Sequence, residues 1–192
     1  MKPILFSGEM VRAILDGRKT QTRRVVKPQP TGGYLGFINE RLKHWFRHEP
    51  RSIEIGCPYG RPGDTLWVRE TWASHKYMDD TKPSEFTAGA QMLPVWYRAD
   101  NVQSDERGKW RPSIFMPRWA SRITLRVVDV RVETLWDMTV SKMTAEGVAE
   151  IENDDKHPLT PFITLWDSIN ADRGHAWYTN PWVWVVEFEV VS

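Results

Sequence analysis

The chain has 192 residues and a mass of 22.5 kDa, enough for one domain with a hydrophobic core. Hydrophobic residues make up 41% and charged residues 27%, which indicates a globular chain and excludes a disordered one. No apolar run approaches the roughly 18 residues of a membrane span, and the N-terminal segment is too poor in apolar residues for a signal peptide. With a single cysteine, Cys57, the chain is expected to be cytoplasmic and free of disulfides.

The net charge of +1 conceals an uneven distribution. Residues 1–51 carry eleven Lys and Arg against four Asp and Glu, a local charge of +7, whereas residues 52–192 carry a charge of −6. Two interpretations of the positive segment stay open: a solvated face, or a site for a phosphate, a nucleotide or a nucleic acid. The near-neutral total argues against a general nucleic-acid coat, which depends on many phosphate contacts.

The first predicted element is a helix with Ser7 as its N-cap and Gly17 as the residue that ends it. Residues 18–26 are then expected to form a turn that leads into a short strand. Residues 28–57 are rich in proline and glycine, which predicts a long irregular insertion with one helical turn near residues 40–48.

A strand is predicted at residues 65–72, where Glu70 and Trp72 share the phase of the apolar residues. A carboxylate on an apolar phase costs free energy unless it is paired or useful. Residues 74–112 are expected to form a second irregular insertion. The strand at 122–135 has the longest signal, and its apolar phase switches midway, which indicates a β-bulge or a strand that turns a barrel corner.

Two further helices are predicted, one from Thr139 to Gly147 and one beginning at Thr160, where a proline follows. The last strand covers residues 182–190. The pattern therefore predicts an α+β fold of four or five mostly antiparallel strands and three helices, arranged as a small, partly closed barrel. We expect a single domain over residues 1–192, in which the two insertions are loops without a core of their own.

Common motifs are absent from the sequence: there is no Walker loop, no dinucleotide-binding fingerprint, no nucleophile elbow and no zincin motif. His44 and His48 have the i, i+4 spacing of zinc ligands on a helix, but no obvious third ligand follows. We therefore expect neither a metal site nor a cofactor.

The basic segment after the first helix places Lys19 three residues before Thr22. Threonine is a poor nucleophile alone and needs a general base. Lysine can be that base if burial or neighbouring cations lower its pKa, and Arg18, Arg23 and Arg24 are such neighbours. On spacing alone the commoner interpretation is a basic turn in which Thr22 caps backbone groups.

This segment resembles the signature of the ASCH domain, a branch of the PUA-like superfamily, which reads G-x-K-x-x-E-x-R. Gly17, Lys19 and Arg24 fill three of its four positions, and Thr22 stands where many members have Glu. The segment is most similar to the version G-R-K-T-x-T-x-R of small bacterial N4-acetylcytidine amidohydrolases, in which a Lys, a Thr and a Glu form the catalytic set. The resemblance implies Lys19, Thr22 and Glu146 as the matching residues.

The similarity extends to the longer ASCH proteins encoded by phages and prophages, through the segments 62–72, 116–122 and 180–184. It covers nearly the whole chain outside the insertions at 28–57 and 74–112. The resemblance implies a PUA-like β-barrel flanked by helices.

The implied function is hydrolysis of the acyl group on the exocyclic nitrogen of N4-acylcytosine or N4-acylcytidine compounds. Thr22 would attack the acyl carbonyl, Lys19 would take its proton, and Glu146 would orient Lys19 or activate water. Arg24 and backbone N–H groups would stabilise the oxyanion.

Substrate-binding roles follow from strand phase. Trp67 or Trp72 would stack on the base, and Glu70 would pair with a base edge or with Arg69. The expected partner is thus a small nucleoside or nucleobase, with no membrane involved. The alternative is a module that binds RNA or a modified nucleobase, or an RNA-processing ASCH protein, in which case single-stranded RNA is the partner. The Lys19, Thr22 and Glu146 set separates the two, because a binding module does not need it.

Overall fold

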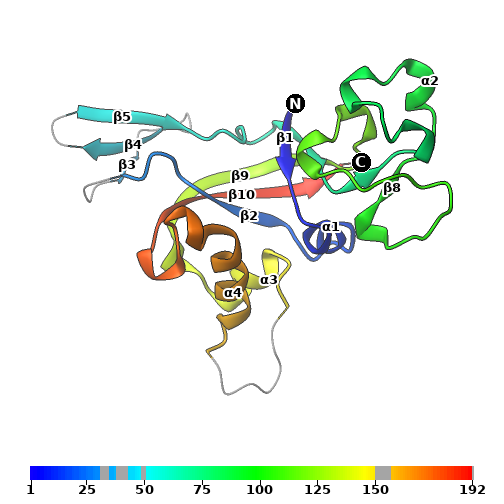
Figure 1. Ribbon diagram of the computed structural model, residues 1–192. Helices are drawn as coiled ribbons and strands as arrows, with labels where there is room; N and C mark the ends of the chain where they lie inside the picture. The colour runs from blue at the N-terminus through cyan, green and yellow to red at the C-terminus, as the bar shows by residue number, and fades with distance from the viewer. Residues whose placement is uncertain (31–34, 38–42, 49–50, 150–156, 192) are drawn as a thin grey trace. The chain divides into compact units, whose positions relative to one another are not determined.

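The computed structural model describes residues 1–30, 35–37, 43–48, 51–149 and 157–191, and between 31 and 55 it describes the backbone alone (Figure 1). Within these residues the strands are β1 (Lys2–Leu5), β2 (Gln21–Val25), β3 (Leu35–Phe37), β4 (Lys43–His48), β5 (Arg51–Gly56), β6 (Thr65–Arg69), β7 (Trp72–Ala73), β8 (Trp96–Tyr97), β9 (Thr124–Thr134) and β10 (Trp182–Val190). The α-helices are α1 (Gly8–Leu15), α2 (Ala88–Gln91), α3 (Val140–Ala145) and α4 (Thr160–Asn170). The predicted α+β class is confirmed. None of the helices in the described part of the chain has the length and apolar character that crossing a membrane requires.

Five strands form a mixed sheet in the order β1-β6-β9-β10-β2. β1 pairs with β6 in parallel, whereas β6 with β9 and β10 with β2 are antiparallel. The expected small barrel is wrong, because β1 and β2 are the end strands of this order and no pairing joins them among the described residues. The alternation of apolar residues predicts which face of a strand is buried, and it is the same in an open sheet as in a closed one.

The insertion at 28–57 is not irregular. β3, β4 and β5 form a three-stranded antiparallel sheet, and β4 occupies the described part of the region where a helical turn was expected. Pro28 and Pro30 lie before β3, where the missing N–H of proline does not interrupt the pairing of the strands. The second insertion, 74–112, contains α2, β8 and short 3₁₀ turns, and its Phe86 is buried in a hydrophobic cluster.

The chain forms two compact units. The first unit comprises residues 1–17, 65–126 and 190–192, and the second comprises residues 18–64 and 127–189. β9 and β10 contribute residues to both.

The phase switch predicted in β9 is present in its burial pattern. Leu125 and Val127 are buried on one phase of the strand and Val130 on the other, while Val128 is 51% exposed. Val127 keeps the phase of Leu125, so the switch falls after Val127, within the part of β9 that belongs to the second unit. The buried face of the strand therefore changes within β9 itself.

The first unit begins with the predicted capped helix. The Ser7 hydroxyl accepts a hydrogen bond from the backbone N–H of Met10, and Gly17, with φ of 73°, follows the C-cap residue of α1. Val11 and Ile14 bury the apolar stripe of the helix. A second cluster of this unit is aromatic and consists of Trp72, Phe86, Met116 and Ala120.

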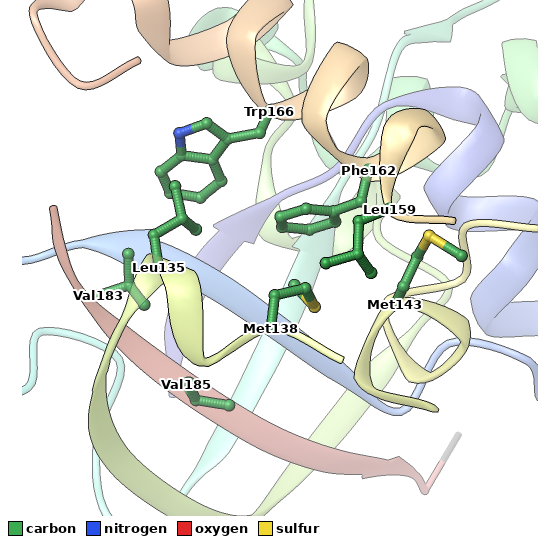
Figure 2. Packing of buried hydrophobic residues seen from close by; sticks show 8 residues of the cluster. All are labelled: Leu135, Met138, Met143, Leu159, Phe162, Trp166, Val183 and Val185. Atoms are coloured by element: carbon green, nitrogen blue, oxygen red, sulfur yellow. The ribbon is translucent and has the colours of Figure 1, made fainter. Parts of the chain in front are cut away.

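The second unit has a core that is assembled from α3, α4 and β10 (Figure 2). Its fully buried members are Leu135, Met138, Met143, Leu159, Phe162, Trp166, Val183 and Val185. α3 begins next to Thr139, where the helix was expected to start, and the Thr139 hydroxyl caps it by accepting from the N–H of Lys142. α4 takes Leu159 as its N-cap, so that Thr160 is the first helical residue and not the cap. This core fixes α3 and with it the residues that follow its last turn.

Candidate functional site

The backbone brings the end of α3 beside the segment that precedes β2. Lys19 and Glu146 form an isolated antiparallel bridge, and the N–H of Thr20 donates to the carbonyl oxygen of Ala145 at 2.9 Å. Glu146 is the C-cap of α3, and Gly147 follows it with φ of 79°. A left-handed residue at this place ends the helix and turns the chain, which fixes the position of Glu146.

The side chains of Lys19 and Glu146 form a buried ion pair. The Nζ of Lys19 donates to Oε2 of Glu146 at 2.9 Å and to the backbone carbonyl oxygen of the same residue at 2.7 Å. Lys19 is 3% exposed and Glu146 is 5% exposed. The pairing of these two residues, 127 positions apart, is the contact that the predicted catalytic set required.

Burial lowers the pKa of Lys19, and the charge and hydrogen bond of Glu146 oppose this shift without cancelling it. The positive charges of Arg24 and Arg23 lower the pKa further. A lysine whose pKa is lowered in this way gives up its proton more readily than an exposed one, which is the property of a lysine general base.

Arg23 joins this pair to a second carboxylate. Its two terminal nitrogens donate at 2.9 Å to different residues, one to Oε1 of Glu146 and the other to Oε2 of Glu133 on β9. Gln21, on the same phase of β2, donates to the backbone carbonyl oxygen of Lys142 at 2.9 Å. The pleat of β2 thus directs Gln21 and Arg23 to α3.

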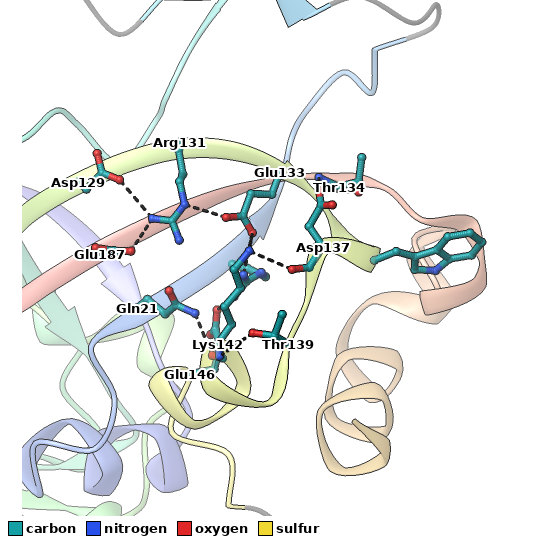
Figure 3. Close-up of polar contacts among 12 residues, drawn as sticks. Gln21, Asp129, Arg131, Glu133, Thr134, Asp137, Thr139, Lys142, Glu146 and Glu187 are labelled. Carbon is teal, nitrogen blue, oxygen red and sulfur yellow. Dashed lines mark hydrogen bonds and ion pairs between the residues drawn. The ribbon is translucent and has the colours of Figure 1, made fainter. Parts of the chain in front are cut away.

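Glu133 is the centre of the outer part of the network (Figure 3). It accepts from Lys142 at 3.0 Å and from Arg131 at 2.7 Å, in addition to Arg23. Burial alone would raise the pKa of Glu133, but the hydrogen bonds from Arg131 and Lys142 and the charge of Arg23 together lower it. Arg131 also donates to Asp129 and Glu187, so that the network reaches the surface of the second unit.

Thr22 lies on β2 opposite Val186 of β10 and is 2% exposed. Because successive side chains of a strand point to opposite faces, it does not share the face of Gln21 and Arg23. Within the part of the chain that the structure describes, the Thr22 hydroxyl makes no hydrogen bond to Lys19. The structure therefore joins Lys19 to Glu146 but leaves the third predicted member outside the hydrogen-bonded pair.

Arg24, the predicted oxyanion ligand, is half-buried and lies opposite Trp184. One of its terminal nitrogens donates to the backbone carbonyl oxygen of Arg23 at 3.2 Å. It shares the phase of Thr22 on β2, so these two predicted residues lie on one face of the strand.

The predicted base-binding residues all belong to the first unit. Trp67 is 6% exposed and has the guanidinium of Arg69 4.7 Å from its ring centroid. Trp72 is fully buried and makes edge contacts with Phe86 and Trp119. Both rings are thus packed within that unit.

Glu70, which is 1% exposed, pairs with Arg122 and not with Arg69. Arg122 donates to its two oxygens at 3.0 and 3.2 Å and also to Asp100. Burial raises the pKa of Glu70, which the hydrogen bond and charge of Arg122 oppose in part. The sequence signal of a carboxylate on an apolar phase thus marks an ion pair in the core.

Sequence reasoning missed Glu133 and Lys142, and it treated Arg23 only as a neighbouring charge. The alternation of Asp129, Arg131 and Glu133 along one face of a strand was the available signal, because such a row of charges needs partners. As for metal ligands, no group of three His, Cys, Asp or Glu that would suit an ion occurs in the described part of the chain. The side chains of His44 and His48 lie outside it.

No family model matches the chain, and no curated protein matches it. The chain is similar to a solved structure, the crystal structure of a protein from Enterococcus faecalis V583 that is described by the family model DUF984. The two share 10% sequence identity with a TM-score of 0.43, and the match covers 100% of this chain and 81% of that chain.

Proposed function

We propose that the protein is an amidohydrolase that removes the acyl group from the exocyclic nitrogen of N4-acylcytosine or N4-acylcytidine compounds. The observation that carries the proposal is the buried Lys19–Glu146 ion pair. The sequence resemblance to the ASCH branch of the PUA-like superfamily names the same two residues, and the superfamily assignment is part of the proposal.

The chemistry begins with proton transfer to a neutral Lys19. Thr22 Oγ forms a bond to the acyl carbon as its proton passes to Lys19 Nζ. The tetrahedral intermediate collapses with cleavage of the carbon–N4 bond, and Lys19 returns the proton to the leaving amine. Water then hydrolyses the threonyl ester, which releases the carboxylic acid and restores the hydroxyl.

This route requires the Thr22 hydroxyl to approach Lys19 when substrate binds. Catalytic hydrogen bonds are often absent in an unliganded enzyme and form only in the substrate complex. In the competing route, water attacks the carbonyl, with Glu146 as general base and the hydroxyl of Thr22 as a hydrogen-bond donor. Both routes use the Lys19–Glu146 pair, so the pair is the common element of the proposal.

Glu70 and Trp72 have no part in this mechanism, because the Glu70 carboxylate is paired with Arg122 and the Trp72 ring is fully buried inside the first unit. Arg24 and the backbone N–H groups beside it are the proposed stabilisers of the oxyanion, since a fixed positive charge near a developing negative charge lowers the barrier.

The test is an ultraviolet assay of the purified protein with N4-acetylcytidine, with N4-acetylcytosine and an N4-acetylated RNA as parallel substrates. Turnover of the nucleoside that is lost in Lys19→Met and Glu146→Gln supports the proposal. A folded wild-type protein that binds the nucleoside or single-stranded RNA and leaves the amide intact overturns it in favour of a binding module.

The two routes are separated by intact-mass measurement after an acid quench during turnover. A mass increase of one acetyl group that is absent from Thr22→Ala indicates the threonyl ester. Turnover that persists at a reduced rate in folded Thr22→Ala indicates direct attack by water, because that route needs no threonyl ester.

A further inference from the structure

Arg23 divides its guanidinium between two carboxylates that come from different elements. One terminal nitrogen binds Glu146 at the end of α3 and the other binds Glu133 on β9, each at 2.9 Å. The side chain is 1% exposed. A planar guanidinium whose two terminal nitrogens are both hydrogen-bonded has little freedom to rotate. Arg23 therefore fixes the Glu146 carboxylate in one orientation.

Glu146, in turn, divides its two oxygens between two cations. Oε1 accepts from Arg23 and Oε2 accepts from Lys19. A buried carboxylate that loses its only cationic partner is strongly destabilised, because its charge is then left without compensation away from water. With Arg23 in place, Glu146 retains a cationic partner when Lys19 is neutral, because arginine does not give up its proton in proteins.

Glu133 prevents Arg23 from becoming a partner of Glu146 alone. It also accepts from Lys142 and Arg131, whose side chains are each 30% exposed. The outer end of the Arg23 guanidinium is therefore anchored in a network that spreads its charge toward the surface.

We propose that Arg23, anchored by Glu133, is a positioning residue that keeps the Glu146 carboxylate paired with a cation and oriented in both protonation states of Lys19. The inference rests on the proposed function in that Lys19 must alternate between these states during turnover. Without Arg23, loss of the Lys19 proton would leave Glu146 as an unpaired buried anion, so the ion pair would hold the proton and Lys19 would be a poor base. The positive charge of Arg23 also acts on Lys19 directly and lowers its pKa.

The experiment measures the protonation of Lys19 without substrate. Protein that carries ¹³C-labelled lysine is titrated by NMR, and the Lys19 side-chain resonance is assigned by its absence from Lys19→Arg. In Arg23→Gln we expect the titration midpoint of Lys19 to move up by about one pH unit, as for removal of a like charge within a few ångströms. Arg23→Lys, which retains the charge, should lie closer to the wild type than Arg23→Gln does.

Arg122→Gln is the matched control, because Arg122 also bridges two carboxylates and the substitution is the same as in Arg23→Gln. It should leave the Lys19 midpoint unchanged. The same variants are then compared in the pH dependence of kcat/KM for N4-acetylcytidine. The acidic limb, along which the general base loses its proton, should move with the Lys19 midpoint in Arg23→Gln.

The Lys19 midpoint tests the role of Arg23 independently of whether the protein hydrolyses the nucleoside. A midpoint that is unchanged in folded Arg23→Gln overturns the inference, even if the wild type hydrolyses the nucleoside. An upward shift in Arg23→Gln, partly restored in Arg23→Lys, supports it, even if the wild type has no activity on this substrate. Equal shifts in Arg23→Gln and Arg122→Gln indicate a general loosening of the fold and overturn it.

Discussion

Each of the two units buries a glutamate against an arginine, but only the second unit adds a lysine to the same carboxylate. In the first unit Arg122 occupies both oxygens of Glu70 and continues to Asp100. That cluster joins one guanidinium to two carboxylates, and no lysine takes part in these ion pairs. In the second unit Lys19 shares Glu146 with an arginine, so the cluster contains a cation that can lose its proton while the carboxylate keeps a partner.

The comparison of the Glu70 and Glu146 clusters indicates that a buried ion pair is not by itself a sign of a functional site. Glu70 is at least as buried as Glu146, and its pKa is raised by burial, yet its cationic partner is an arginine, which does not give up its proton. Perturbed carboxylates in structural pairs and in catalytic pairs look alike until the identity of the cation is considered. The predictions below test this contrast.

The largest effect is expected on catalysis in the second unit. Lys19→Arg keeps the charge but cannot act as a base, so kcat should fall by about 10³-fold or more. If the threonyl ester forms, Thr22→Ala should lower kcat by at least the same factor, whereas Thr22→Ser should retain measurable activity. The double variant should be little worse than either single variant, because residues that act as a unit are not additive.

Arg122→Lys is the control for these assays and should turn over N4-acetylcytidine at close to the wild-type rate. Thermal midpoints establish that every variant is folded. Near wild-type rates in folded Lys19→Arg and Thr22→Ala would show that the mechanism is wrong.

The next effect is on stability and belongs to the first unit. Arg122→Ala leaves the Glu70 carboxylate buried without its cation and should lower the free energy of unfolding by about 2 kcal/mol, a value reduced for the partial exposure of Arg122. Urea unfolding measures the change. Glu70→Gln in the same chain should recover part of the loss, and a double variant as unstable as Arg122→Ala alone would contradict the assignment.

The contribution of a carboxylate to stability should depend on pH in opposite directions in the two units. The pKa of Glu70 is raised above its ordinary value of 4.5, so its contribution to stability is present below pH 4.5 and is lost as the pH rises through the raised pKa. The pKa of Glu133 is lowered from 4.5, so its contribution is present above pH 4.5 and is lost as the pH falls through the lowered pKa.

The measurement compares wild type with Glu70→Gln and with Glu133→Gln by urea unfolding between about pH 3 and 8. The stability of wild type relative to Glu70→Gln should fall as the pH rises above 4.5. Relative to Glu133→Gln it should fall as the pH drops below 4.5. If both stability differences changed in the same direction with pH, the burial of Glu70 or the ion pairing of Glu133 would be contradicted.

The smallest effects concern one helix cap in each unit. Ser7→Ala and Thr139→Ala should each lower the free energy of unfolding by about 1 kcal/mol, since each hydroxyl accepts a hydrogen bond from a helix N–H. Only Thr139→Ala should also reduce kcat, because α3 ends at Glu146. Equal activity of the two variants would mean that the position of Glu146 does not depend on the start of α3.

Local features of this chain were predictable because their causes are local. The cap at Ser7, the left-handed Gly17 and the bounds of β10 follow from residues within a few positions of each other. The same holds for the phase switch in β9, which the sequence shows as a change in the spacing of apolar residues. The helix expected near 40–48 failed because pairing with a neighbouring strand, and not local preference, decides the conformation there.

For the site, Lys19 and Glu146 were matched from the sequence by resemblance, and their contact is now seen in the fold. Arg23 and Glu133 could not be assigned from the sequence, since 110 positions separate them and their meeting depends on strands β2 and β9 being placed at α3. Glu70 could be marked as unusual, but its partner could not be named, because Arg69 and Arg122 were equally available by chemistry.

The sequence by itself determined the cap and buried stripe of α1, the bounds of β10, the phase switch in β9, and which residue types are present for proton transfer. Only the tertiary structure decided whether the sheet closes, which glutamate pairs with which cation, and that Lys19 is buried deeply enough for its pKa to be lowered. The physical reason is that periodicity and capping act over one or two turns, whereas charge pairing and desolvation depend on groups that only folding brings within hydrogen-bond distance.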